Sequence, residues 1–249
     1  MDSEQYIYGR NAVAEYLEHR PEHISKIYIR KQLQGKAIRD LEQLASGNRI
    51  PVQRVPGNKL AGMVGQVNDQ GIVAAVSEAG YMELEDWLEE ADIDENPVLL
   101  ALDEIEDPHN FGAIVRTALA AGVDAVMVSK HRQAPLSAGV MKASAGTLLR
   151  MPVIRVVNLN QALIKLKEAG FWVCGADVEG DRDFRKQDYR LPLVALLGSE
   201  EKGIRKKTRE HCDILVRIPM QNRVESLNAS VSAALICYEI LRQRQPEPV

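Results

Sequence analysis

The stretch LVALLGSEEKGIRKKTREHCDILVRIPMQNRVESLNASVSAALICYEILRQ, from Leu193 to Gln243, decides the fold. Its pattern predicts an apolar strand, a basic helix, a second strand, an irregular turn and a final helix. The first strand ends at Gly198-Ser199-Glu200, and the second leads into Ile218-Pro219-Met220. Ligands of α/β proteins usually bind at the carboxyl ends of parallel strands. The sequence therefore predicts a functional site at this edge of a sheet.

Length and composition are those of a globular protein with two domains. The chain has 249 residues, 45% hydrophobic and 27% charged, and domains typically contain about 100–150 residues. Its cysteines, Cys174, Cys212 and Cys237, are scattered, so neither a disulfide framework nor a zinc site is indicated, and a reducing cytosol fits. The sequence has no signal-peptide pattern and no apolar run of about 18 residues, so we expect a cytoplasmic protein without a membrane span.

Negative charge is concentrated in one segment. The formal net charge is −4, but residues 78–96 contain nine acidic side chains and no Lys or Arg, which leaves a net charge of +5 for the rest of the chain. Because phosphate binding requires positive charge, this distribution is compatible with a nucleic-acid partner.

The order of strand and helix patterns predicts the domain organisation. Residues 1–77 form a small α/β unit of three or four strands. The acidic residues 78–96 form a linker that includes a short docked helix, because they contain Leu84 and Trp87. From residue 97 to 249, apolar strands alternate with helices, one of them over residues 140–148. This alternation is typical of a mostly parallel sheet with helices on both faces.

Several common enzyme signatures are absent from the sequence. It contains no G-x-G-x-x-G dinucleotide loop and no G-x-x-x-x-G-K-[ST] phosphate loop. The H-E-x-x-H zinc motif and the G-x-S-x-G nucleophile elbow are also missing. The five histidines are dispersed, and a surface or turn role suits them better than metal binding. The polar strand ends therefore serve a different chemistry.

Polar residues at helix starts or in apolar surroundings are the candidate site residues. Asn110, at a helix start, is either an N-cap or a site residue. Arg116 interrupts an apolar helix, so its guanidinium lies at a rim or pairs with an anionic ligand. Glu200 either begins the next helix or belongs to the site, and Ser226 and Asn228 either cap the last helix or act in the site. That helix has an apolar repeat that predicts its buried face: Leu227, Val231, Leu235, Tyr238 and Leu241.

Three separated segments resemble the motifs of a known family. They are DPHNFGAIVRTALAAG at residues 107–122, LLGSEEKGI at 196–204 and IPMQNRVESLNASVSAAL at 218–235. Their order and spacing are similar to those of the SpoU branch of the knotted (SPOUT) RNA 2'-O-ribose methyltransferases. The resemblance implies an α/β fold with a deep trefoil knot and homodimers formed through the C-terminal domain. The N-terminal unit resembles the small RNA-binding domain of the bacterial enzymes that methylate a guanosine of 23S ribosomal RNA.

The resemblance also implies a cofactor, S-adenosylmethionine, and no metal. The cofactor would be held mostly by backbone groups of the second and third motifs, between apolar walls. The matching residues are Leu197, Gly198, Gly203, Ile218, Met220 and Leu227, with Ser144 and Thr147 nearby.

Arg116 matches the family arginine that is proposed to take the proton of the 2'-hydroxyl or to bind the target phosphate. A neutral guanidinium at pH 7 would cost about 7 kcal/mol, for a pKa shift of roughly 5 units. We therefore interpret Arg116 as a clamp on the phosphate and the 2'-oxygen that stabilises the developing alkoxide. The resemblance gives Asn110, Glu200, Ser226 and Asn228 the role of positioning Arg116 and the ribose.

Two positions depart from the family pattern. Glu201 stands where glycine is common, and Asn222-Arg223 stands where small residues are usual. Because asparagine tolerates left-handed backbone angles, Asn222 can replace a glycine. Glu201 leaves the shape of the cofactor loop open.

Alternative functions also fit the sequence. The substrate could be a transfer RNA, although the separate N-terminal domain favours ribosomal RNA. From a different class, the chain could be a non-catalytic RNA-binding protein with a relic pocket. Four residues argue against this alternative: Asn110, Arg116, Glu200 and Asn228. The basic segment 205–209 serves a partner subunit or RNA phosphates, or is only a solvated helix face.

Overall fold

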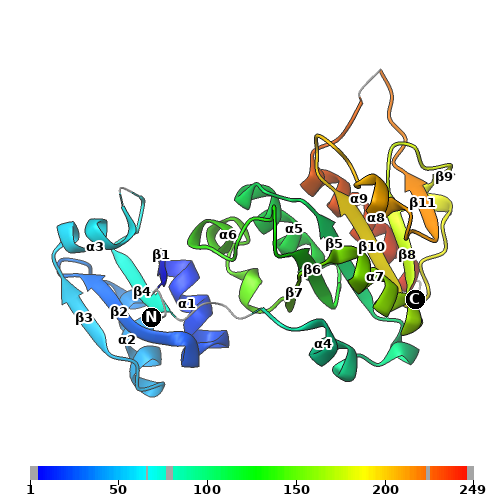
Figure 1. Cartoon of the computed structure of the whole chain (residues 1–249). Coiled ribbons are helices and arrows are strands. Elements are labelled where there is room, and N and C mark those ends of the chain that lie inside the picture. Colours follow the sequence, from blue (N-terminus) through cyan, green and yellow to red (C-terminus); the bar gives the residue numbers. More distant parts are fainter. Residues whose placement is uncertain (1–4, 66, 77–80, 223–224, 246–249) are drawn as a thin grey trace. The chain divides into compact units, whose positions relative to one another are not determined.

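The computed structural model describes residues 5–65, 67–76, 81–222 and 225–245 (Figure 1). Contacts divide the chain into two compact units. The first comprises Met1–Gly80 together with Pro135–Arg150, and the second comprises Tyr81–Ala134 together with Met151–Val249. The sequence pattern did not indicate that residues 135–150 group with the N-terminal residues.

The first unit is built on a four-stranded sheet, the upper end of the predicted three or four strands. Strands β1 (Gln5–Tyr8), β4 (Ile72–Val76), β2 (Ile24–Arg30) and β3 (Val52–Val55) lie side by side in that order. β4 pairs antiparallel with β1 and β2, whereas β2 and β3 are parallel. Strand β1 was not predicted from the sequence.

Helices cover both faces of this sheet unequally. α1 (Arg10–His19) and α2 (Lys36–Gly47) bury their apolar residues, including Val13, Tyr16 and Leu41, and the short helix η1 (Pro21–His23) follows α1. The buried Ile27 and Ile29 of β2 face this core. The opposite face carries α3 (Gly57–Val64), a helix of eight residues that the sequence analysis missed, and only its Leu60 is buried.

The helix predicted over residues 140–148 is wrong in its extent. α6 (Ala138–Ala143) ends early, and a separate turn, η3 (Thr147–Leu149), follows. The break lies at Ala145 and Gly146, whose φ angles of 52° and 87° are left-handed. A Cβ atom at Gly146 would lie 2.7 Å from a side-chain carbon of Glu15 in α1, so close packing favours glycine there.

The second unit contains a seven-stranded parallel sheet, which confirms the predicted class. Every strand pairing among its described residues is parallel. The spatial order is β7 (Val153–Val156), β6 (Ala125–Ser129), β5 (Val98–Asp103), β10 (Leu193–Gly198), β8 (Trp172–Ala176), β11 (Ile214–Arg217) and β9 (Arg182–Asp183). The two-residue strand β9 was not predicted.

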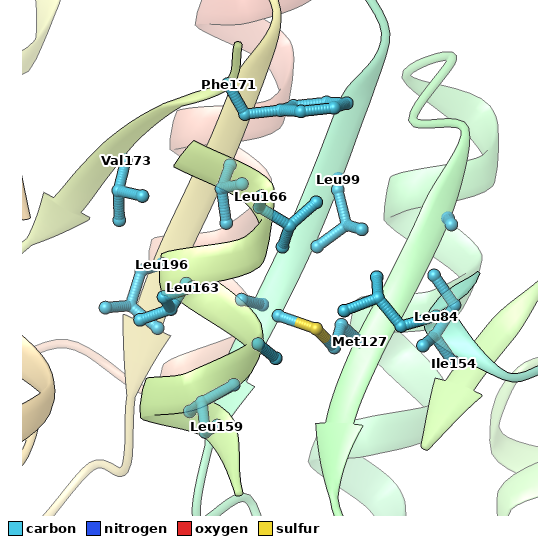
Figure 2. Close-up of a cluster of buried hydrophobic side chains, with 14 of the residues drawn as sticks. Leu84, Leu99, Met127, Ile154, Leu159, Leu163, Leu166, Phe171, Val173 and Leu196 are labelled. Carbon is cyan, nitrogen blue, oxygen red and sulfur yellow. The ribbon is translucent and has the colours of Figure 1, made fainter. Parts of the chain in front are cut away.

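Helices cover both faces of the parallel sheet, as expected (Figure 1). α7 (Leu159–Glu168) lies on one face, where its leucines point toward Leu99, Met127 and Leu196 of the strands (Figure 2). The opposite face carries α5 (Pro108–Ala120) and α9 (Ala229–Arg244), which pack on each other, and α9 also contacts β10. Two short helices, η4 (Phe184–Lys186) and α8 (Lys206–Arg209), complete this unit. All six residues of β5 are buried, as a strand covered on both sides requires.

The predicted buried face of α9 is wrong. Its buried apolar residues are Ala229, Ala233, Ile236, Cys237 and Ile240. Val231, Leu235 and Tyr238 are 47%, 38% and 52% exposed in the single chain. Small side chains let two helices approach closely, so the Ala-rich side faces α5 and the larger apolar residues lie outside.

The acidic segment contains the predicted docked helix. α4 (Leu84–Glu90) and the short helix η2 (Ile93–Glu95) follow Met82, whose backbone exchanges hydrogen bonds with Val153 and Arg155 beside β7. Leu84 and Trp87 are buried in the core under α7, and the Trp87 ring lies 5.8 Å from that of Phe171. The carboxylates of this segment therefore stay on the surface of the second unit.

We expect Trp87→Ala to lower the free energy of unfolding by about 3–5 kcal/mol, because it empties a buried aromatic site. The control is Glu89→Ala, on the exposed side of α4, with a change of about 0.5 kcal/mol or less. Denaturant unfolding measures both. Equal midpoints for the two variants would show that α4 is not docked.

Candidate functional site at the sheet edge

A cavity of about 510 Å³ opens at the carboxyl ends of β8, β10 and β11. It lies at the edge of the sheet where the sequence predicts a site. Six of the eight predicted cofactor residues line it: Leu197, Gly198, Gly203, Ile218, Met220 and Leu227. Glu200 and Ser226, two of the predicted catalytic residues, also line it.

A tight turn forms one wall of the cavity. The amide of Gly203 donates to the carbonyl of Ser199 at 2.9 Å, and the Ser199 hydroxyl accepts from the amide of Lys202 at 3.3 Å. A Cβ atom at Gly198 would lie 2.0 Å from the carbonyl carbon of Gly203. Gly203 itself has a left-handed φ of 61°. Glu200 thus belongs to this turn and does not begin the next helix, which was one of its two interpretations.

An ion pair with a buried carboxylate anchors the end of this turn. Asp103, at the end of β5, is fully buried and accepts from the backbone amide of Arg205 at 3.0 Å and from its Nε at 2.8 Å. This hydrogen bond raises the pKa of the Arg205 guanidinium further above its ordinary value. Glu104, with a left-handed φ of 64°, lies 3.4 Å from both Arg205 and Arg132.

Asn228 joins three of the five predicted catalytic residues, Asn110, Glu200 and itself, into one cluster. Its Nδ2 donates to Oδ1 of Asn110 at 3.0 Å and to Oε2 of Glu200 at 3.1 Å. Its Oδ1 accepts from the backbone amide of Ser230 at 2.9 Å, so Asn228 also caps α9. The two interpretations of Asn228, as a cap and as a site residue, are therefore compatible.

Asn110 is not the cap of its helix. Asp107 caps α5, because its carboxylate accepts from the amide of His109 at 3.0 Å. Asn110 lies one turn inside the helix, where its side chain reaches Asn228. Ser226 does not cap α9 either, since that position belongs to Asn228; Ser226 is exposed at the cavity.

Arg116 does not join the cluster within one chain. It stands six residues after Asn110 on α5, which places it roughly 240° around the helix and about 9 Å along it. Its side chain is exposed and forms no hydrogen bond or ion pair with any residue that the structure describes. It is not among the residues that line the cavity.

Ser144 and Thr147 are also separate from the cavity lining. They belong to the compact unit that contains the N-terminal residues. The Ser144 hydroxyl donates to the carbonyl of Met141 at 2.9 Å, and the Thr147 hydroxyl donates to the carbonyl of Ser144 at 2.7 Å. Both side chains thus stabilise the bend between α6 and η3.

Charged residues after β8 line the cavity and were missed by the sequence analysis. Asp177 is nearly buried and accepts from the amide of Glu179 at 2.9 Å. Arg209 is hydrogen-bonded to Glu179 and lies 3.7 Å from Asp177. The sequence contained a signal for these residues, because the acidic side chains Asp177 and Glu179 follow β8 at the same sheet edge as the ends of β10 and β11. Arg205 and Arg209, both in the basic segment 205–209, thus form ion pairs with carboxylates of the same chain.

The two departures from the family pattern have different outcomes. Asn222 has a left-handed φ of 55°, the backbone conformation that asparagine tolerates and that a replaced glycine would have. Arg223 lies outside the described residues. Glu201 is exposed at the mouth of the cavity, so its side chain leaves the backbone of the turn free.

Among the residues that the structure describes, neither a candidate metal-binding cluster nor a membrane-spanning helix is found. No group of three or more His, Cys, Asp or Glu side chains among them could hold a metal ion. None of the helices described is long and apolar enough to cross a membrane.

Comparison with known proteins matches both parts of the chain. Residues 97–238 match the SpoU rRNA Methylase family, and residues 6–82 match the RNA 2'-O ribose methyltransferase substrate binding family. The 23S rRNA (guanosine-2'-O-)-methyltransferase RlmB of Pseudomonas aeruginosa is 41% identical, over 99% of both chains. RlmB of Pseudomonas putida is 40% identical, over 98% of this chain and 99% of its own.

Solved structures share the fold of this chain over most of its length. The SpoU methyltransferase AviRb from Streptomyces viridochromogenes, in complex with the cofactor AdoMet, superposes with a TM-score of 0.82 at 25% identity. The match covers 97% of this chain and 90% of AviRb. The fold class is thus the knotted α/β class that the sequence motifs predict.

We expect Gly198→Ala to disrupt the cavity, because its new methyl group would overlap the backbone of Gly203. Overpacking of this kind costs typically about 1–3 kcal/mol, so the thermal midpoint of unfolding should fall. Gly62→Ala is the control, since a Cβ there meets nothing within 4 Å and alanine is preferred in helices. A Gly198→Ala protein as stable as Gly62→Ala would contradict the close approach.

Proposed function

Because this chain belongs to the SpoU rRNA methylase family, we propose that it methylates the 2'-oxygen of a guanosine ribose in 23S ribosomal RNA, with S-adenosylmethionine as the methyl donor. The observation that carries the proposal is the 41% identity to RlmB over 99% of both chains, which includes both family matches. In this proposal residues 1–77 bind the RNA, residues 78–96 link the two domains, and residues 97–249 catalyse the methyl transfer. The reaction then takes place in the cytoplasm, where the ribosomal RNA of a bacterium is found.

The cavity has properties that suit S-adenosylmethionine. Its volume of about 510 Å³ is within the range of roughly 300–1,000 Å³ for small-molecule sites. Leu197, Ile218 and Leu227 supply apolar walls for a planar base, while the turn after Gly198 exposes main-chain groups that can bind its polar edge. When bound, the cofactor supplies a methyl group already activated by its sulfonium. No side chain of the protein is then required as a nucleophile.

The protein's own task is to align the ribose and to manage its proton. The cluster of Asn110, Asn228 and Glu200 offers a carboxylate and amide groups at the rim of the cavity. It positions the acceptor hydroxyl by hydrogen bonds, and alignment is a large part of the barrier in such a displacement. Arg116 keeps its proton and clamps the target phosphate and the 2'-oxygen, stabilising negative charge as it develops.

A second copy of the chain would complete this site. In one chain Arg116 lies exposed on α5 and outside the cavity lining. The neighbouring helix α9 exposes Val231, Leu235 and Tyr238, which repeat at helical spacing and form an apolar stripe. We assign this stripe to a homodimer interface formed by the C-terminal domain. Pairing of two such surfaces would bring the Arg116 of one protomer toward the cavity of its partner.

We expect Arg116→Ala to reduce methyl transfer to unmodified 23S ribosomal RNA by about 100-fold or more, as for removal of a group that stabilises developing charge. Binding of S-adenosylmethionine, measured by calorimetry, should change by less than about twofold, because Arg116 does not line the cavity. Lys130→Ala, at another exposed cation of the same unit, should retain activity.

Incorporation of a labelled methyl group, followed by alkaline cleavage, tests the reaction itself. A 2'-O-methyl group blocks cleavage at one linkage, so a single protected guanosine is the expected result. Methylation of a base, or no incorporation by the unaltered protein, would refute the proposed function. Near-normal turnover of Arg116→Ala would refute the role of the arginine alone.

We expect Leu235→Glu to convert a dimer into a monomer of 27.7 kDa, because it places a charge in the apolar stripe. Ile164→Glu is the matched control, since Ile164 on α7 is 42% exposed and Leu235 is 38% exposed. Sedimentation measures the mass of each. A monomeric unaltered protein, or an unchanged mass for Leu235→Glu, would contradict the assigned interface.

A further inference from the structure

The face of the four-stranded sheet that carries α3 also presents a row of aromatic and basic side chains, and its Tyr8 and Tyr28 are partly buried against Leu60 of α3. Residues alternate along β2, so Ile27 and Ile29 face the core while Lys26, Tyr28 and Arg30 point to the other side. Tyr28 of β2 and Tyr8 of β1 both pair with Val73 of β4, the central strand between them. The two tyrosines therefore flank one position of the sheet on the same face.

Three ammonium groups from different segments lie over these rings. Lys26 Nζ and Lys59 Nζ, the latter from α3, are 5.8 and 5.9 Å from the centroid of the Tyr28 ring. Lys142 Nζ, from α6, is 5.8 Å from the centroid of the Tyr8 ring. None of the three lysines forms an ion pair with a carboxylate among the residues that the structure describes. Their charges are thus held by rings and are available to an anion.

A hollow continues this surface beside α3. It is lined by Arg30, Gly57, Asn58, Ala61, Gly65 and Val67, together with the nearly buried Asp69. Arg30 donates from one Nη to Asp69 at 2.8 Å, yet 44% of its side chain stays exposed. Arg30 thus lines the hollow with a guanidinium that is only partly used by Asp69. By sequence, the unit formed by residues 1–80 and 135–150 carries twelve Lys and Arg against nine Asp and Glu, a net charge of +3.

We infer that this face, defined by Tyr8, Tyr28, Lys26, Lys59, Lys142 and Arg30, binds an unpaired strand of the substrate RNA. The inference rests on the proposed function for the identity of the RNA. Unpaired bases stack on aromatic rings of sheet surfaces, and Lys and Arg bind the phosphates between them. A base that stacks on Tyr28 or Tyr8 displaces an ammonium group from the ring. The freed lysine then pairs with the adjoining phosphate.

The test uses the full-length double variant Lys26→Gln with Lys59→Gln and a fluorescent single-stranded RNA of mixed sequence, without methyl donor. Loss of two phosphate contacts should weaken binding about tenfold at low salt and lower the slope of log affinity against log salt by about 1.4. The control is Lys36→Gln with Arg39→Gln, which removes the same charge from exposed positions on α2, on the opposite face of the sheet. It should leave the slope unchanged.

Substitutions at Tyr28 separate stacking from charge. Tyr28→Phe keeps the ring and should bind the single strand normally, whereas Tyr28→Leu keeps the apolar volume without the ring and should bind several-fold more weakly. Duplex RNA of the same sequence should be affected less than twofold by Tyr28→Leu. Equal losses for single strand and duplex, or full binding by Tyr28→Leu, would overturn the stacking role.

Measurements of RNA binding and of enzymatic turnover distinguish a failure of this inference from a failure of the proposed function. With 23S ribosomal RNA, the double lysine variant should raise KM while kcat at saturating RNA stays unchanged. If the unaltered protein does not methylate ribose, the proposed function fails, yet the binding comparison still tests the face. If the unaltered protein methylates 23S ribosomal RNA and the lysine variant has an unchanged salt slope and KM, the RNA-binding face is wrong.

Discussion

The ion pair between the buried Asp103 and the partly exposed Arg205 is the contact on which the shape of the site depends. Asp103 ends β5 and is fully buried, and it is paired in register with Gly198 at the end of β10. The guanidinium and the backbone amide of Arg205 both donate to this carboxylate, so the turn from Gly198 to Ile204 is closed at both ends. Removing Arg205 would leave the buried carboxylate of Asp103 without its partner, which is destabilising because an unpaired buried charge is costly. The carboxylate thereby defines one wall of the cavity.

One side chain at the start of α9, that of Asn228, both caps the helix and organises the candidate site. Asn228 satisfies the first turn of that helix with its oxygen and holds Asn110 and Glu200 with its nitrogen. An asparagine offers both a donor and an acceptor, which aspartate and serine caps do not offer in the same geometry. The hydrogen bonds of Asn228 thus hold the start of α9 next to Glu200, which lines the cavity.

The sequence was most informative where burial dictates residue type. The apolar strands predicted after residue 97 include β5, which is buried along its whole length, and Gly198 marked a polar strand end at the site. Prediction failed where tertiary packing chose between two apolar faces, as in α9, where small residues turned inward. It also failed at Ala145 and Gly146, where packing against Glu15 ends a helix that local pattern would continue. Arg116 shows a further limit, because a motif names a residue without its surroundings, and in one chain Arg116 lies outside the cavity lining.

The docked acidic segment has a consequence for the direction from which RNA can approach. α4 and the residues around it hold carboxylates at the β7 edge of the sheet, whereas the cavity lies toward β11 at the other end of the strand order. Because the buried Trp87 holds the acidic segment on the core, the segment does not fold over a basic surface and neutralise it, as a loose acidic tail would. Phosphates are repelled over roughly 8 Å at physiological salt. The segment therefore repels polyanions from the β7 side of the catalytic unit. RNA is then expected to approach from the opposite side, where the cavity lies.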